Sequence, residues 1–117
     1  MQKKASSNSK SRLANSSERA FQSWVKEQPC VFCGQSGPGI VDHSEGSTFS
    51  NQKILVGHWF VVASCLECDS HKTLGSHRRQ FDITGIKHSE ACIGLLDRYP
   101  GTPPPIEVYE AIKAWRR

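Results

Sequence analysis

The sequence lacks any run of about 18 apolar residues, the length that a helix needs to cross a membrane. No apolar stretch follows the basic N-terminal residues MQKKASSNSK, which argues against a secretory signal. Apolar residues make up 37% of the 117-residue chain, below the roughly 45–50% of ordinary globular proteins. We therefore expect one small domain with a thin hydrophobic core and no contact with a membrane.

An excess of positive charge is also missing from most of the chain. Residues 21–117 hold ten basic and ten acidic side chains, whereas residues 1–20 hold five basic side chains and one acid. Residues 1–16 are rich in serine, asparagine and lysine, so we expect them to form a disordered basic tail. Such a tail suits contact with a polyanion such as DNA, and it equally suits a solubilising end. Its candidate DNA-binding side chains are Lys3, Lys4, Lys10 and Arg12.

The apolar pattern of residues 17–117 predicts a single α+β domain. Ser16 or Ser17 is expected to cap a helix that runs to about residue 28, where Pro29 stops it. Short β-branched and aromatic runs predict a strand over residues 40–43 and a β-like region over residues 54–63, made of two runs around Gly57. The other predicted helices run from Asp69 to about Gly75, over residues 89–99 and over residues 106–117, the last with Ile106, Tyr109, Ile112 and Trp115 on one stripe.

Five cysteines are many for a chain of this length, and four of them form two C-x-x-C pairs. The pairs are Cys30 with Cys33 and Cys65 with Cys68, separated by 31 residues. Each C-x-x-C turn presents two sulfurs to one ion, and tetrahedral Zn²⁺ takes four such ligands. A redox pair is the alternative, but two pairs in one short chain favour structural zinc. The fifth cysteine, Cys92, is expected to be a small buried apolar residue.

Histidine and aspartate residues lie near the ends of the predicted elements between and after the cysteine pairs. Hydrolysis of a phosphodiester needs a base that activates water, and a neutral imidazole does this near neutral pH. A divalent ion held by aspartate and histidine would neutralise the scissile phosphate. The candidate residues are Asp42, His43, His58, Asp69, His71 and His77.

Together, Cys30-x-x-Cys33-Gly34, then Asp42-His43, then Cys65-x-x-Cys68 resemble the HNH (ββα-metal, treble-clef) endonuclease superfamily. The spacing is most similar to small phage and prophage nucleases, including the recombination-enhancement, RecA-dependent type. The resemblance covers residues 29–80, and the helices expected over residues 89–117 lie outside it. It implies a zinc-stabilised treble-clef domain with flanking helices, acting on DNA in recombination or processing in the cytoplasm of a bacterial host. A recombinase or a host defence protein would be its protein partner.

The resemblance also implies a role for each candidate residue. The four cysteines would hold the structural zinc, and His43 would be the general base. Asp42 would orient His43 or bind a catalytic Mg²⁺, Mn²⁺ or Zn²⁺, and His58 falls near the variable middle position of the motif. Asp69 and His77 would complete the catalytic metal site, with His71 close enough to substitute. On an ideal helix Asp69 and His77 lie about 80° apart, which favours this pair if the helix continues past Gly75.

Two departures from the family pattern leave the function open. Asp69 stands where the family has a histidine, and no asparagine occupies the middle position. A catalytically inactive HNH-like module that binds DNA or a host protein as a regulator or inhibitor is therefore an alternative. A purely structural zinc protein is a third reading. Lys72, Arg78 and Arg79 flank the candidate site and are expected to contact phosphates, although such charges also occur on solvated helix faces.

Overall fold

A computed structural model describes residues 13–45, 50–51 and 54–115 of the chain. The basic tail side chains Lys3, Lys4, Lys10 and Arg12 lie outside the described residues, as does most of the predicted tail. The elements are α1 (Ser16–Lys26), β1 (Ile40–His43), β2 (Ser50–Asn51), β3 (Ile54–Leu55), β4 (Val61–Ser64), α2 (Leu66–Thr73), α3 (His77–Thr84), α4 (His88–Arg98) and α5 (Ile106–Lys113). The α+β class expected from the sequence is confirmed.

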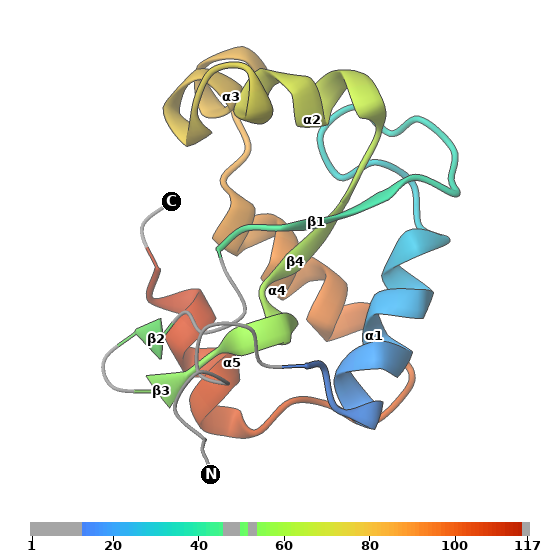
Figure 1. The fold of residues 1–117 in the computed structure, drawn as a ribbon, viewed down its shortest axis with the longest axis vertical. Coiled ribbons are helices and arrows are strands. Elements are labelled where there is room, and N and C mark those ends of the chain that lie inside the picture. Colours follow the sequence, from blue (N-terminus) through green and yellow to red (C-terminus); the bar gives the residue numbers. More distant parts are fainter. Residues whose placement is uncertain (1–12, 46–49, 52–53, 116–117) are drawn as a thin grey trace, which may run out of the picture.

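Strands β1 and β4 form an antiparallel pair in the middle of the molecule (Figure 1). Their register places Ile40 opposite Ser64 and His43 opposite Val61. All four residues of β4 are buried, because α1 and α4 both pack against this strand. The strand pair therefore has a buried inner strand, β4, and β1 carries Asp42 and His43 at its end. A second pair, β2 with β3, has two residues in each strand.

The cap of helix α1 lies one residue before Ser16, the first of the two predicted caps. The side chain of Asn15 accepts a hydrogen bond from the N–H of Glu18 at 2.8 Å, and the Glu18 carboxylate accepts one from the N–H of Asn15 at 2.9 Å. This reciprocal capping box satisfies two N–H groups at the helix start, so Asn15 is the cap and not Ser16 or Ser17. Phe21 and Val25 are fully buried, as the apolar pattern of this helix predicts.

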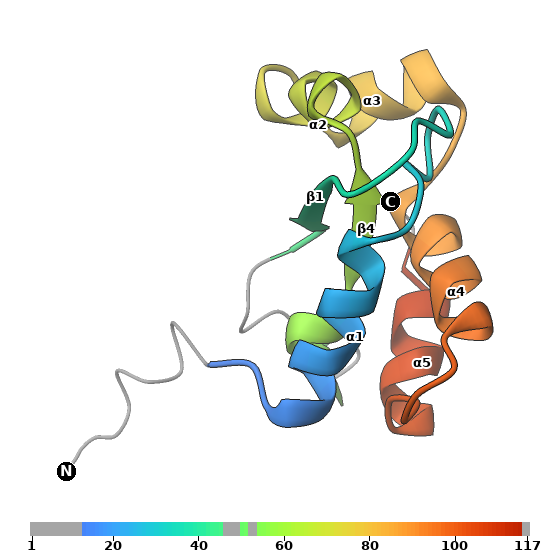
Figure 2. The same ribbon diagram turned by 90° about the vertical axis from the view of Figure 1, so that its right-hand side faces the viewer.

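The hydrophobic core is one cluster between the hairpin and the helices α1, α4 and α5. Figure 2 shows α1 on one side of the hairpin and α4 and α5 on another, with α2 and α3 above. Cys92 is fully buried in this cluster, which confirms its predicted role, and its thiol donates to the carbonyl of Trp59 at 3.3 Å. The completely buried hydrophobic members are Phe21, Val25, Phe60, Val61, Val62, Cys92, Leu95 and Ile112.

The β-like region predicted over residues 54–63, with its two runs around Gly57, contains the two separate strands β3 and β4. Gly57 has φ of +61°, a left-handed conformation that a glycine adopts without strain, and a 3₁₀ turn follows over residues 57–59. The turn separates β3 from β4 and directs Trp59 and Phe60 into the core, where they are 4% and 0% exposed. Burial of the two aromatic rings thus outweighs the strand propensity of this segment.

Helix α5 is also shorter than predicted, and only part of its predicted apolar stripe is buried: Ile112 is completely buried, and Tyr109 and Trp115 pack against the core. It ends at Lys113, and Ile106 is 66% exposed although it lies on the predicted apolar stripe. The buried residues of α5 are Val108, Ala111 and Ile112, which face α4. Within the described part of the chain, no helix has the length and apolar character needed to cross a bilayer.

Candidate functional site

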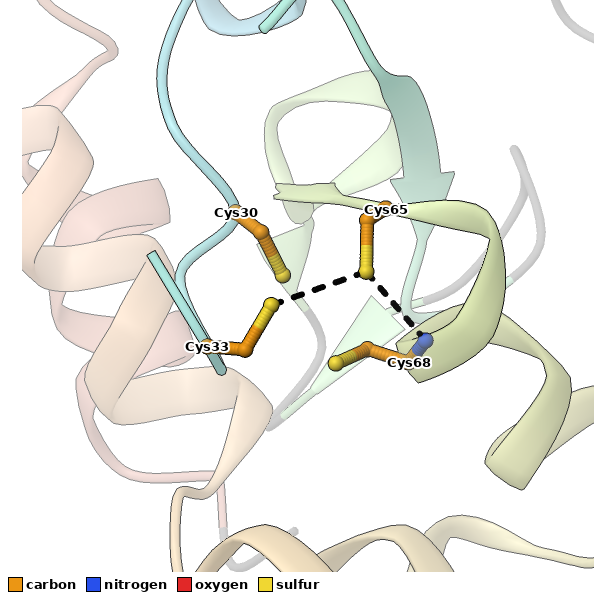
Figure 3. Close-up of side chains that lie close together, drawn as sticks. All are labelled: Cys30, Cys33, Cys65 and Cys68. Atoms are coloured by element: carbon orange, nitrogen blue, oxygen red, sulfur yellow. Dashed lines mark hydrogen bonds between the residues drawn. The ribbon is translucent and has the colours of Figure 1, made fainter. Parts of the chain in front are cut away.

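The four paired cysteines meet in one cluster, as their spacing predicts. Cys30 and Cys33 come from a loop after α1, and Cys65 and Cys68 come from the start of α2 (Figure 3). Their four sulfur atoms lie within 4.8 Å of one another, and the Cys33 and Cys65 sulfurs are 3.7 Å apart. All four cysteines are free thiols. The cluster could therefore bind a metal ion such as zinc.

The geometry of the cluster fits a tetrahedral ion. A Zn–S bond of about 2.3 Å gives a tetrahedron whose sulfur–sulfur edges are about 3.8 Å. The 3.7 Å separation between Cys33 and Cys65 has this length, and it is far from the roughly 2 Å of a disulfide bond. Three of the four cysteines are at most 7% exposed, so water has little access to their sulfurs. The donor set and its burial both suit a structural metal site.

The backbone around the sulfurs is arranged to support negative charge. The N–H of Phe32 donates to the Cys30 sulfur and the N–H of Cys68 donates to the Cys65 sulfur, both at 3.4 Å. Burial raises the pKa of Cys30, but hydrogen bonds from the backbone outweigh it and lower that pKa to about 7. Gly34, with φ of +83°, allows the turn that returns its N–H to the Cys30 carbonyl at 2.9 Å. The first turn thus favours a thiolate at Cys30, the form that binds a metal, whereas burial raises the pKa of Cys68 in the second turn.

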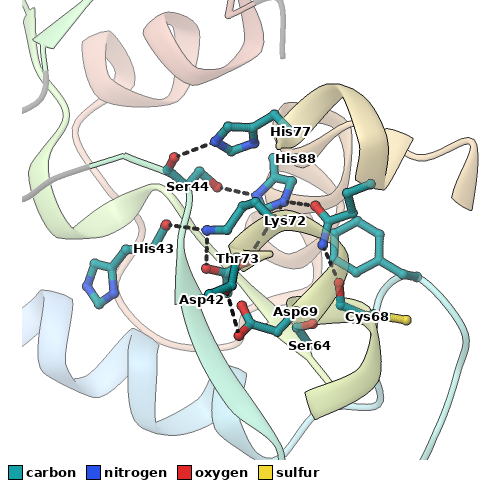
Figure 4. A network of polar contacts seen from close by, with 12 residues as sticks. Asp42, His43, Ser44, Ser64, Cys68, Asp69, Lys72, Thr73, His77 and His88 are labelled. Atoms are coloured by element: carbon teal, nitrogen blue, oxygen red, sulfur yellow. Dashed lines mark hydrogen bonds and ion pairs between the residues drawn. The ribbon is translucent and has the colours of Figure 1, made fainter. Parts of the chain in front are cut away.

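A second polar group surrounds Asp42 at the end of β1. The Lys72 ammonium reaches across from α2 and donates to Asp42 Oδ1 at 2.5 Å and to the carbonyl of His43 at 3.1 Å (Figure 4). Asp42 is 6% exposed, and its other oxygen accepts no hydrogen bond from the described residues. Burial raises the pKa of Asp42, and the Lys72 ammonium partly opposes this rise. Lys72, predicted to contact phosphate, is thus bound to Asp42.

His43 and His58 form a pair beside this group. His43 Nε2 lies 3.3 Å from His58 Nδ1, and the side-chain amide of Gln22 lies 3.5 Å from the same His43 nitrogen. The Gln22 amide also donates to the carbonyl of His58 at 2.9 Å, which joins the pair to α1. Burial, then the neighbouring His58 and Lys72, lowers the pKa of His43 below 6.5. The imidazole of His43 is therefore neutral at physiological pH, and His43 is exposed to solvent.

His88 belongs to the same group, and the sequence did not point to it. The Ser44 hydroxyl donates to His88 Nδ1 at 2.7 Å, and His88 Nε2 donates to the Gln80 side-chain oxygen. Gln80 in turn donates from its amide nitrogen to the Cys68 carbonyl at 2.8 Å. This series of hydrogen bonds between uncharged groups joins the end of β1 to the cysteine cluster. His77 lies against it, with its Nε2 donating to the Ser44 carbonyl at 3.1 Å.

In the described residues, no three of the predicted ligands of a second, catalytic metal have their ligand atoms within 4.8 Å of one another. Asp42 is paired with Lys72, Asp69 accepts from Thr73 at 3.3 Å, and His77 is bound to Ser44. The helix on which the pairing of Asp69 with His77 was argued ends at Thr73, and His77 opens α3 instead. A β-carbon at Gly75 would lie 2.7 Å from the His71 carbonyl, so the close turn between the helices needs glycine. In the described residues, the cysteine cluster is the group of three or more metal-binding side chains whose ligand atoms lie within 4.8 Å.

Basic side chains line a shallow hollow next to the Asp42 group. The hollow has a volume of about 420 Å³ and is lined by Lys72, Ser76, His77 and Arg78. Arg78 pairs with Asp82 at 3.0 Å, but both side chains are exposed, so the pair is weak and easily exchanged. Arg79 is exposed on the same helix. The hollow can accept an anion of phosphate size.

No family model, curated protein or solved structure matches the chain.

The burial of His88 and its hydrogen bonds predict how the free energy of unfolding depends on pH. Burial, then the neighbouring His77 and Lys72, lowers the pKa of His88 from 6.5 to about 3. The unfolded chain binds a proton below pH 6.5 that the folded chain does not, so the free energy of unfolding falls by about 1.4 kcal/mol per pH unit toward pH 3 from this residue. Urea unfolding at several pH values should show this slope in the wild type and lose it in His88→Gln. Equal slopes in both proteins, with equal zinc content, would contradict the assignment.

Proposed function

We propose that the protein is a DNA endonuclease of the HNH type, in which the hairpin β1–β4, helix α2 and the four cysteines form a zinc-bound treble clef. The observation that carries the proposal is the position of His43. It ends β1 beside a buried carboxylate, it has a lowered pKa, and it lies exposed next to a second histidine. A neutral, accessible imidazole of this kind can remove a proton from water.

In the proposed reaction His43 takes a proton from a water molecule whose oxygen attacks the phosphorus of the phosphodiester. The new phosphorus–oxygen bond forms as the bond to the leaving oxygen breaks, and solvent protonates that oxygen. The charge of the phosphate is met by Lys72 and Arg78, which line the adjacent hollow. A divalent ion held by Asp42, Asp69, His71 and His77 stays a prediction from the family resemblance, and no step of this reaction uses it.

Cleavage of nucleic acid by the purified full chain tests the proposal. Supercoiled plasmid and single-stranded DNA are incubated with zinc-loaded protein, with and without added Mg²⁺ or Mn²⁺. We expect nicked or linear plasmid in a reaction whose rate follows the protein concentration. Protein purified in the same way with the substitution His43→Ala controls for a contaminating nuclease. Intact DNA under every condition, with zinc bound and the protein folded, would overturn the proposal.

A binding module without catalysis is the second candidate function. Two observations favour it: the predicted metal ligands are dispersed among other partners, and α2 and the turn that follows it expose large apolar side chains. Leu66 is 75% exposed and Leu74 is 87% exposed. Exposed apolar residues of this size suit a protein partner, for which a recombinase or a host defence protein is the expectation. Absence of cleavage together with retained DNA binding would favour this candidate.

The exposed arginines of α3 give a prediction for DNA binding. Arg78→Ala and Arg79→Ala should each weaken binding to unrelated duplexes equally, because phosphate contacts carry no sequence information. Each should also reduce by about one the slope of log affinity against log salt concentration. Fluorescence anisotropy of a labelled duplex over a salt series measures both quantities. Arg98→Ala, at the far end of α4, is the matched control, and a loss of equal size in this variant would contradict the assignment.

A further inference from the structure

The position of the Lys72 ammonium is fixed from two sides. It donates to Asp42 Oδ1 and to the carbonyl of His43, and these two acceptors lie on adjacent residues of β1. Its backbone belongs to α2, whose first turn carries Cys65 and Cys68 of the cysteine cluster. The side chain is 17% exposed. The position of the ammonium is therefore fixed by α2, by the cysteine cluster at the start of α2 and by β1. A lysine on a solvated helix face has no such restraints.

This location is the one that the resemblance assigns to a divalent ion. Asp42 is the predicted ligand on β1, and its carboxylate is buried, so it needs a positive partner. Lys72 supplies that partner within the chain. A divalent ion at Asp42 would have to displace an ammonium that is hydrogen-bonded to two acceptors, and it would find Asp69 and His77 engaged elsewhere.

We propose that the Lys72 ammonium is the resident cation of the candidate site and occupies the place at Asp42 that a divalent ion would take. What this inference implies for DNA cleavage rests on the proposed function. An ammonium has three N–H donors, of which Asp42 and His43 take two. Within the described residues the third N–H has no further acceptor and is available to a phosphate oxygen. The zinc-loaded protein then cleaves DNA without a second metal, with Lys72 as a phosphate-binding residue.

Binding of Mn²⁺ tests the resident cation without reference to cleavage. Electron paramagnetic resonance follows the signal of free Mn²⁺ during titration of zinc-loaded protein. We expect wild type and Asp42→Asn to bind Mn²⁺ equally weakly. Lys72→Met removes the charge and keeps the length of the side chain, so it should bind Mn²⁺ at least tenfold more tightly, a gain that Lys72→Met with Asp42→Asn loses. Lys113→Met, on the exposed end of α5, is the matched control and should leave Mn²⁺ binding unchanged.

The decisive comparison needs only wild type and Asp42→Asn, so it stands even if the Lys72 variants fail to fold. Tight Mn²⁺ binding by wild type that Asp42→Asn abolishes would overturn the proposal, because the ion would then displace Lys72 unaided. Failure of Lys72→Met to gain a site, with its zinc content and circular dichroism intact, would overturn it as well. Lys72→Arg keeps a cation at this point and is expected to gain no Mn²⁺ site.

Cleavage separates this inference from the proposed function. Plasmid cutting in buffer freed of divalent ions, with zinc content verified by mass spectrometry, is the result expected if both hold. Cutting that strictly requires added Mg²⁺ or Mn²⁺ keeps the nuclease and overturns the resident cation. Absence of cutting under all conditions, with Mn²⁺ binding as expected, overturns the nuclease and keeps the resident cation.

Discussion

Replacement of Cys65 by serine is expected to abolish metal binding at the cysteine cluster and to unfold the domain. Cys65 supplies one of four sulfurs, caps α2 through its side chain and adjoins the buried strand β4. Three remaining ligands cannot close a structural zinc site. Structural zinc contributes about 10–16 kcal/mol in small zinc-binding peptides, as much as the roughly 5–15 kcal/mol that stabilises a whole domain. A core of this size does not offset such a loss.

Metal content and cooperative unfolding measure this prediction. The wild type should carry about one Zn²⁺ per chain and unfold in one transition, whereas Cys65→Ser should carry none and show no transition. Cys92→Ala is the matched control, because Cys92 is buried in the apolar core and lies outside the cysteine cluster. It should keep the zinc and lose only the smaller stability that a lost buried sulfur costs. A zinc-free Cys65→Ser protein with native circular dichroism would refute the zinc assignment.

The sequence predicted those parts of the fold that depend on local pattern. The strand over residues 40–43 is confirmed residue for residue, and α1 ends two residues before the predicted limit. The cysteine cluster is confirmed because each C-x-x-C turn is itself a local structure. The predicted end of α2 near Gly75 is confirmed, whereas α3 after the turn and the 3₁₀ turn that follows Gly57 were not predicted.

The site was less predictable because its contacts join distant parts of the chain. Ser44 and His88 are 44 residues apart and hydrogen-bonded, and Lys72 is 30 residues from Asp42. No spacing rule links such pairs, so neither the pairing of Lys72 with Asp42 nor the position of His88 was predicted. His88 also lies outside residues 29–80, where the family resemblance applies. The roles of Lys72 and His88 depend on their positions beside the end of β1, which are known only from the folded structure.

Replacement of His43 by alanine is expected to abolish most of the cleavage and leave the fold intact. A general base contributes about 10²–10⁴-fold to a rate, so His43→Ala should cut DNA slower by this factor. The residue is exposed, and within the described part of the chain its ring hydrogen-bonds to the side chains of Gln22 and His58. Zinc content and urea unfolding should therefore match the wild type. Glu107→Ala, on the exposed face of α5, is the control that should cut at the wild-type rate.

The pH dependence of cleavage gives His43 a signature that a structural role would not produce. The base acts when neutral, and burial, His58 and Lys72 hold its pKa below 6.5, so the rate should rise with pH, reach its plateau, and have its acid limb below pH 6.5. His58→Gln removes one cause of the lowered pKa, so the limb should move to higher pH. A limb that stays in place in this variant, or a His43→Ala protein that cuts at the wild-type rate, would show that another group activates the water.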